Sequence, residues 1–361
     1  MNTIQSNTNY VIFKKVLSIH SEDRDITKWP DSNHFEVTAP VEYKNVISLR
    51  LNNIEIPSSY YIFSEKNQNV KLSFKVLPRY VAGAPPNYPD WTNDSANQLA
   101  AQQLSTSSNL SITIVSGSYD YTQLAYEINE KLNKAVSDFT GITYTGFALK
   151  YNTVNMKLMF INEQDNFRID FSQPEVYDTC VGNYYENYTN WGLGSYIGFN
   201  KKVYNASLVP SVSMSWNSLP PITNVYYLEP EHILDLFGES HVYMELMYYN
   251  SMDEIAPYAE KSSSSMNAKF GGKHNAAFAK IPLFARHVES FSSRDTYLSN
   301  TFTNDPPLER IQKFKIKMRF HDGRIVDFNN CNYNFTIEIC MLRPDTLKPY
   351  LKVNQEAYGS S

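Results

Sequence analysis

The side chains best suited to catalysis are thinly spread along this chain. Seven histidines are present, but none forms the HExxH or HxH spacing that places two zinc ligands on one face. Residues 271–274 (Gly-Gly-Lys-His) resemble a phosphate loop but lack the GxxxxGKS or GxxxxGKT frame, so a flexible loop is the better interpretation. No GxSxG nucleophile turn occurs, and Asp165 and Asp253-Glu254 are predicted to be solvated carboxylates. We therefore expect no enzyme, no cofactor and no metal site.

The charge balance argues against nucleic acid as a direct partner. The 361 residues include 32 Lys and Arg against 37 Asp and Glu, a net charge of −5, whereas proteins that coat nucleic acids are usually basic. The odd set Cys180, Cys331 and Cys340 contains no CxxC pair and predicts buried free thiols in a reducing compartment. With no apparent signal peptide and no apolar run of bilayer length, we expect a protein made in a cytosol.

Ring-bearing side chains gather in one irregular segment, residues 172–219. Tyr and Trp bury large areas and still offer a polar group, which is why they are enriched at interfaces. Three interpretations stay open: the rings pack on the protein's own body, contact a partner protein, or form a platform that binds glycans. The candidate interface residues are Tyr184, Tyr185, Tyr188, Trp191, Tyr196, Phe199 and Tyr204.

Strong strand patterns lie at both ends of the chain. Phe314, Ile316, Met318 and Phe320 alternate with cationic residues, and a period of two places the apolar set on one face. An Asp-Gly turn at 321–324 follows, and a second alternating run ends at Met341. Residues 46–56 alternate too, with a shift of register at Asn52-Asn53 that predicts a β-bulge.

About a dozen short strands and one long helix favour an all-β fold. The helix is predicted at 120–136, where Asp120 can cap it and Gln123 can bond back. Glu231–Phe237, closed by Gly238, is predicted as a shorter helix. We expect an antiparallel jelly-roll β-sandwich in a single domain, with a double jelly roll as the alternative. The expected divisions are an N-terminal arm at 1–31, a domain at 32–342 with insertions at 78–109, 172–219 and 251–275, and a C-terminal tail at 343–361.

A series of short motifs occurs in one order from about Ser21 to about Leu342. The first is Ser21–Asp25 with Trp29-Pro30 and Asn33–Phe35, followed by Asn45–Leu49, Ile54–Ser59 and Gly117–Tyr119. The later ones are Leu193-Gly194, Gly198-Phe199, Phe278–Leu283, Asp322-Gly323, Asp327-Phe328 and Phe335–Ile339. In this order they resemble minor capsid and penton-type proteins of large icosahedral double-stranded DNA viruses. Apart from Leu193-Gly194 and Gly198-Phe199, segments 78–109 and 172–219 lack the pattern.

The resemblance implies a structural protein of the virion capsid, assembled in the host cytoplasm and without catalysis. A minor capsid protein of this kind would cement or support major capsomers through its loops and termini. Its partners would be the major capsid protein and other minor capsid proteins, with copies of itself in a pentamer as a further option. The resemblance leaves a penton at the five-fold vertices open as an alternative, and contact with an internal membrane is not indicated.

Overall fold

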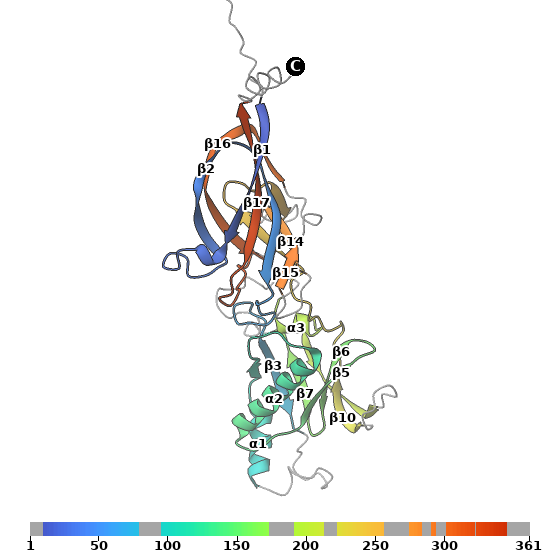
Figure 1. Ribbon diagram of the computed structural model, residues 1–361. Helices are drawn as coiled ribbons and strands as arrows, with labels where there is room; N and C mark the ends of the chain where they lie inside the picture. The colour runs from blue at the N-terminus through green and yellow to red at the C-terminus, as the bar shows by residue number, and fades with distance from the viewer. Residues whose placement is uncertain are drawn as a thin grey trace, which may run out of the picture. The chain divides into compact units, whose positions relative to one another are not determined.

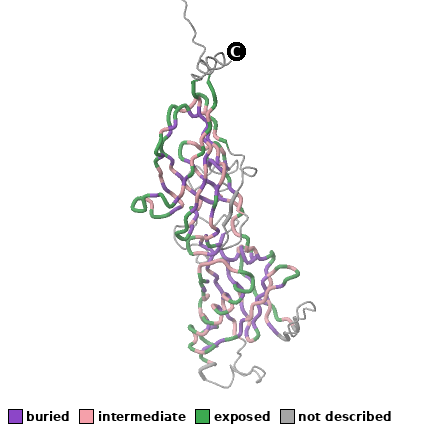
Figure 2. Tube along the Cα trace, viewed as in Figure 1, coloured by how far each residue is buried: buried purple, intermediate pink, exposed green. Residues whose placement is uncertain are grey.

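The computed structural model describes residues 10–78, 95–172, 191–212, 222–255, 274–283, 290–293, 301–321 and 323–344. The chain divides into two compact units: unit 1 is Met1–Tyr60 with Glu239–Ser361, and unit 2 is Tyr61–Gly238. Each unit has its own interior of buried residues, drawn in purple in Figure 2. This division differs from the expected single domain at 32–342. The segment Tyr61–Gly238 forms a second core of its own and does not join the first.

Unit 1 is built on one seven-stranded sheet whose pairs are all antiparallel (Figure 1). Its central strand, β2 (His34–Pro57), has 24 residues and pairs with three other strands. The strand order is β1 (Tyr10–His20), β17 (Asn334–Pro344), β2, β16 (Thr301–Arg319), β11 (His241–Leu246) and β14 (Ala279–Pro282), and β15 (Ser290–Ser293) pairs with β2 off this path. The predicted mostly β fold with antiparallel sheets is confirmed, and the jelly-roll topology stays a prediction.

The alternating runs fill the core of unit 1 as predicted. Phe314, Ile316 and Met318 on β16 are fully buried, while the intervening cations face outward. The predicted bulge is confirmed, because Thr336 pairs with Asn53 and Ile337 with Leu51, which leaves Asn52 without a partner. The extra residue keeps Leu51 and Ile54 on the buried face although their spacing is odd.

The predicted N-terminal arm is wrong for its described part. Strand β1 pairs with β17 along its full length, from Tyr10 opposite Pro344 to His20 opposite Asn334. A short 3-10 turn, η1 (Ser21–Asp23), then leads toward β2. The predicted insertion at 251–275 also contains structure, because β12 (Met252–Ile255) pairs with β13 (His274–Ala277). Most of the predicted tail at 343–361 lies outside the described residues.

Unit 2 contains two four-stranded antiparallel sheets and three helices. The first sheet has the order β4 (Leu110–Thr113), β3 (Lys71–Leu77), β7 (Asn166–Asp170), β8 (Val203–Asn205). The second has the order β5 (Phe147–Asn152), β6 (Lys157–Asn162), β10 (Ile222–Leu228), β9 (Ser207–Val212). The helices are α1 (Ser95–Thr106), α2 (Tyr121–Thr140) and α3 (Leu193–Tyr196).

The long helix α2 begins where its capping residues predict. The Asp120 carboxylate accepts hydrogen bonds from the N–H groups of Thr122 and Gln123, and the Gln123 side chain accepts one from the Asp120 N–H. Gly141, at φ 75°, ends the helix in the left-handed conformation that glycine favours. Its apolar stripe, which includes Leu124, Ile128 and Leu132, packs into the core of unit 2.

Helix α1 lies inside the predicted insertion at 78–109, which is compatible with that prediction. One other local prediction is wrong. Glu231–Phe237 is not helical, because its backbone bonds elsewhere in unit 2: the Leu234 N–H donates to the Met156 carbonyl, and the Asp235 N–H to the Tyr196 carbonyl. Gly238 nevertheless has the expected positive φ, 68°.

Candidate interaction groove

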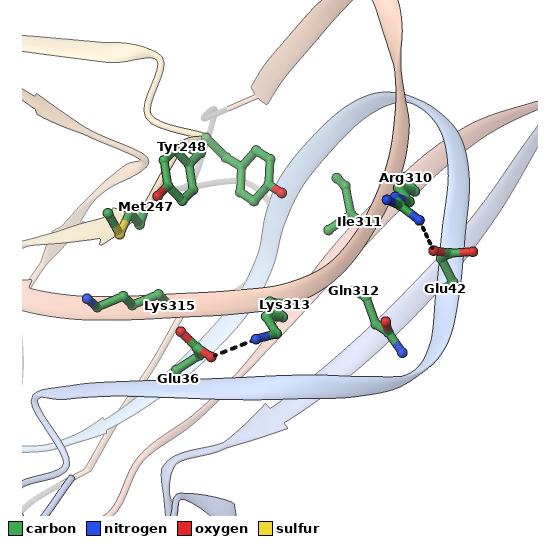
Figure 3. Close-up of a pocket in the computed structure, with 10 residues that line it drawn as sticks. Glu36, Glu42, Met247, Tyr248, Arg310, Ile311, Gln312, Lys313 and Lys315 are labelled. Atoms are coloured by element: carbon green, nitrogen blue, oxygen red, sulfur yellow. Dashed lines mark ion pairs between the residues drawn. The ribbon is translucent and has the colours of Figure 1, made fainter. Parts of the chain in front are cut away.

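Unit 1 has a groove of about 700 Å³ where the outer faces of β2 and β16 meet the turn that follows β11 (Figure 3). Strand β2 contributes Glu36 and Glu42, and β16 contributes residues 310–313 and Lys315. The turn contributes Met247, Tyr248 and Tyr249 across from them. The alternation of β16 explains Lys313 and Lys315, which point away from the core side of Phe314 and Ile316, and the irregular pairing between Ile311 and Lys313 brings consecutive residues to the groove.

Charged side chains on one wall of the groove form exposed ion pairs. Lys313 lies 3.6 Å from Glu36, and Arg310 lies 3.7 Å from Glu42 (Figure 3). The side chains of both cations are 71% exposed, so water screens the pairs and each contributes little stability. Such charges can exchange their partners for those of another molecule at small cost.

The opposite wall presents an aromatic ring that the unit does not bury. Tyr248 is 81% exposed, and its φ of 75° is uncommon outside glycine. The turn around it is tied down: the Tyr249 N–H donates to the Leu246 carbonyl at 2.8 Å, and the Met247 N–H to the Lys315 carbonyl at 3.0 Å. A ring held outward on a bonded turn is suited to burial against a partner protein.

A buried ionic cluster lies elsewhere in unit 1, around Arg319 of β16. The Arg319 side chain is 2% exposed, and its guanidinium lies 2.5 Å from a Glu245 oxygen and 2.6 Å from a Glu254 oxygen. Glu254 also accepts a hydrogen bond from His321, and the guanidinium stacks on the Tyr243 ring at 4.9 Å. Burial and the Glu254 carboxylate raise the pKa of Tyr243 to about 12, so its hydroxyl remains protonated.

The expectation that Glu254 and Asp165 are solvated is wrong. Glu254 is 6% exposed, and Asp165 in unit 2 is fully buried, where it accepts a hydrogen bond from Tyr144. In the sequence both carboxylates fall in polar segments, and their partners lie 21 or more positions away or on other strands. Arg319 and Lys317, which lies 3.4 Å from Glu245, balance the two carboxylates of the buried ionic cluster, which suits an internal brace.

The seven predicted interface residues divide into two groups. Tyr184, Tyr185 and Tyr188 lie outside the described residues. The other four, Trp191, Tyr196, Phe199 and Tyr204, are 2–8% exposed and belong to the core of unit 2. Trp191, Phe199 and Tyr204 surround the Phe171 ring at centroid distances of 5.5, 5.2 and 6.4 Å. The prediction that these four rings face a partner is therefore wrong, because they pack on the protein's own body.

Gly194 shows how tightly this ring cluster is packed. A Cβ at this position would lie 2.3 Å from Trp191 Cη2 and 2.8 Å from the Phe171 ring. Tyr204 also donates a hydrogen bond to Glu231 at the edge of the cluster, and burial raises the pKa of the Tyr204 phenol well above its usual range. Close packing of rings thus explains the glycine at position 194, whereas Gly198 has a φ of 90° and lies against the His232 backbone.

Metal-binding and membrane-spanning features are absent from the part of the chain that the structure describes. It contains no group of three His, Cys, Asp or Glu side chains arranged to hold a metal ion. No helix among these residues is long and apolar enough to cross a bilayer. Cys331 is free and exposed, contrary to its expected burial, whereas Cys340 is free and buried as predicted. Cys180 lies outside the described residues.

Several motif residues of unit 1 that are distant in the sequence are joined by hydrogen bonds. Arg24, 8% exposed, donates hydrogen bonds to the carbonyls of Ser21, Trp29 and Pro30 and, at 2.6 Å, to the side chain of Asn332. We call this group, with the contacts that follow, the motif lock. Further bonds run from Asn33 to the Val326 carbonyl at 2.7 Å and from Ser59 to the Phe328 carbonyl at 2.7 Å.

The motif lock joins segments that lie about 300 positions apart. It ties the connection between β1 and β2 to the connection between β16 and β17 through hydrogen bonds alone. The sequence motif Ser21–Asp25 does not indicate which distant groups its side chains contact. In the structure, the hydrogen bonds of the motif lock hold these distant segments of unit 1 together.

Comparison with known proteins gives one family match and distant structural similarity. A model described as a family of unknown function, DUF5901, matches residues 6–217. No curated protein matches the chain. The mavirus penton protein is 9% identical at a TM-score of 0.41, and the similarity covers 92% of this chain and 99% of that one. A chain of the Sputnik virophage is 12% identical at a TM-score of 0.40, with 92% and 98% covered. Similarity at this level carries no conclusion about function.

Proposed function

The chain belongs to DUF5901, a family of unknown function, and we propose that it is a structural protein of the capsid of a large icosahedral DNA virus. The observation that supports the proposal most is the motif lock. Four of the capsid-like motifs, Ser21–Asp25, Asn33–Phe35, Ile54–Ser59 and Asp327-Phe328, contribute residues to one frame of hydrogen bonds in unit 1. A shared sequence pattern used for a frame, and not for a reactive centre, fits a building block of a shell.

Within the capsid, the protein would act as a minor component that supports the major capsomers. Its partners would be the major capsid protein and other minor capsid proteins, with a pentamer of this chain as the penton alternative. Assembly would take place in the host cytoplasm. The groove of unit 1 provides a contact surface of suitable chemistry, since it combines an exposed ring with exchangeable charges.

The test is to locate the chain in a reconstruction of the intact particle and to measure how variants are incorporated. Tyr248→Asn keeps a residue that tolerates positive φ and removes the ring. We expect it to weaken a groove contact by about 2 kcal/mol, which is roughly thirtyfold in dissociation constant. Tyr126→Gln is the control, because Tyr126 is another exposed ring, 67% accessible, on α2 of unit 2.

Incorporation that falls for Tyr248→Asn and not for Tyr126→Gln would support the groove as a capsid contact. Equal incorporation of both variants would remove the groove from the contact surface, and absence of the chain from purified particles would overturn the capsid role. The mass of the isolated protein separates the two positions, since a stable pentamer would favour the penton.

A further inference from the structure

Two strand edges of unit 1 face a common hollow. The hollow measures about 290 Å³ and is lined by residues 17–19 of β1 on one side and by residues 36–40 of β2 on the other. Among the described residues, β1 pairs only with β17, and the first part of β2 pairs only with β16. Each stretch therefore has one edge without a strand partner, and we call the space between them the strand slot.

The two ends of the seven-stranded sheet treat their edges differently. Strand β14, at one end, has four residues, finishes at Pro282 and buries Ala279 and Ile281 completely. Short length and a terminal proline are common protections against unwanted strand pairing. Strand β1, at the other end, has 11 residues and leaves Ile12 and Val16 60% or more exposed. A long apolar edge of this kind readily accepts an added strand.

The chemistry of the strand slot changes along its length. Its accessible apolar surface comes from Leu17, Val37 and Pro40, which would receive the inward side chains of an added strand. Asp23 and Asp25 also line it, and Thr27 lowers the pKa of Asp25 by donating from its hydroxyl at 2.6 Å and its N–H at 3.0 Å. Lys14 and Lys15 precede the slot on β1, and Lys14 forms an exposed ion pair with Glu338 at 3.2 Å. One end of the edge is thus anionic, and the other carries a cation whose surface partner can be exchanged.

We propose that the strand slot binds an extended segment of another protein, which adds to the β1 edge as an antiparallel strand. The segment would carry apolar side chains for the hollow, a cation near Asp23 and Asp25, and a carboxylate near Lys14 about four residues later. A second copy of β1 fits less well, because β1 contains no carboxylate. The register that sets Ile12 against Val16 also sets Lys14 against Lys14, and like charges directly opposite destabilise a strand pair.

This inference does not depend on the capsid role, since it concerns only the edge chemistry of unit 1. The test uses the full chain and a labelled seven-residue peptide that alternates Val or Ile with polar residues. The peptide places Lys opposite Ser18 and Glu opposite Lys14, and its affinity is measured by fluorescence anisotropy. In the first control peptide the Lys and Glu are exchanged. In the second, the backbone N–H groups that face β1 are methylated, which removes the donors that strand addition requires.

We expect the first peptide to bind at least about tenfold more tightly than either control, a difference of one hydrogen bond or ion pair. Hydrogen exchange should slow in residues 10–20 and 34–40 on binding, and Asp23→Asn with Asp25→Asn should remove the preference for the Lys end. Asp138→Asn on α2, an equally exposed carboxylate of unit 2, should change nothing. Equal binding of the methylated peptide, protection elsewhere, or no binding at millimolar concentration would overturn the proposal. Dimerisation that blocks the peptide would assign the slot to a second copy instead.

Discussion

The two units solve the same packing problem with different side chains. Unit 1 uses long strands whose apolar faces close one sheet around a core rich in Ile, and it braces that core with the buried Arg319 cluster. Unit 2 has shorter strands, covers them with α2, and fills its centre with rings around Phe171. In this chain the segment rich in Tyr and Trp contributes to a core. The groove and the strand slot lie on unit 1, which has fewer aromatic residues.

The largest expected effect comes from removing the brace of unit 1. Arg319→Met leaves Glu254, 4% exposed, without its buried cation, and we expect a loss of about 3–5 kcal/mol. Denaturant unfolding combined with hydrogen exchange should assign the loss to unit 1, with unit 2 unchanged.

Lys134→Met is the matched control for this change. Lys134 pairs with Asp138 on the surface of unit 2, where both side chains are more than 60% exposed. A loss of no more than about 0.5 kcal/mol is expected there. Equal losses for the two variants would show that the Arg319 cluster is not a brace.

The next effect tests the ring cluster of unit 2. Trp191→Ala should destabilise that unit by about 3 kcal/mol, because the ring contacts Phe171 and is only 7% exposed. Trp191→Phe should recover most of the loss. If Trp191→Ala left unfolding unchanged and reduced only partner binding, the rings would belong to an interface after all.

Some elements of the fold can be predicted from the sequence, and others cannot. Local signals were sufficient where the deciding atoms are close in sequence, as with Asp120 and Gln123 at the start of α2 or the bulge at Asn52. They failed where distant backbone groups compete: Glu231–Phe237 has a helical pattern, but Met156 and Tyr196 accept its N–H groups. Alternation also does not reveal which strands share a core, so the two units were not separated.

The candidate sites were less predictable than the fold. The aromatic residues were identified by type, and composition alone does not distinguish a buried ring from one that faces a partner. Tyr248 of the groove was part of a strand pattern and gave no signal of exposure, because its outward position follows from a turn with positive φ. The strand slot exists only because two separate strands bring their edges to one hollow.

A smaller effect concerns the start of α2. Asp120→Ala removes the acceptor for two backbone N–H groups and should cost about 1 kcal/mol in unit 2 alone. Asp120→Ser should retain most of the stability, since Ser also caps helices well. Thermal unfolding monitored by helical circular dichroism measures the change, and equal stability of the Ala and wild-type proteins would contradict the capping role.

The smallest expected effect is a dependence on pH that distinguishes the units. Burial, with Lys315 and Lys317 nearby, lowers the pKa of His34, and burial with Lys280 and His321 lowers that of His241. Both histidines are in unit 1. As the pH falls through 6.5, these histidines take up protons in the unfolded chain before they do so in the folded one. The free energy of unfolding therefore decreases as the pH falls, and it levels off below the pKa values of the folded state.

Hydrogen exchange at pH 7 and at pH 5.5 measures this effect for each unit. We expect faster opening of unit 1 at the lower pH, while His34→Gln with His241→Gln flattens the dependence. Slower opening of unit 1 at pH 5.5, or no change after the double substitution, would rule out these two histidines as the cause.

The sequence of unit 2 is inserted between the two parts of unit 1, and this order has a consequence for biosynthesis. Unit 2 is complete once the ribosome has passed Gly238, whereas β2 must wait for β16 and β17, whose paired residues are made some 250 positions later. Domains fold as units while the chain is still being made. The inner unit can therefore fold during translation, and the outer frame that carries the contact surfaces closes only when the last strands emerge.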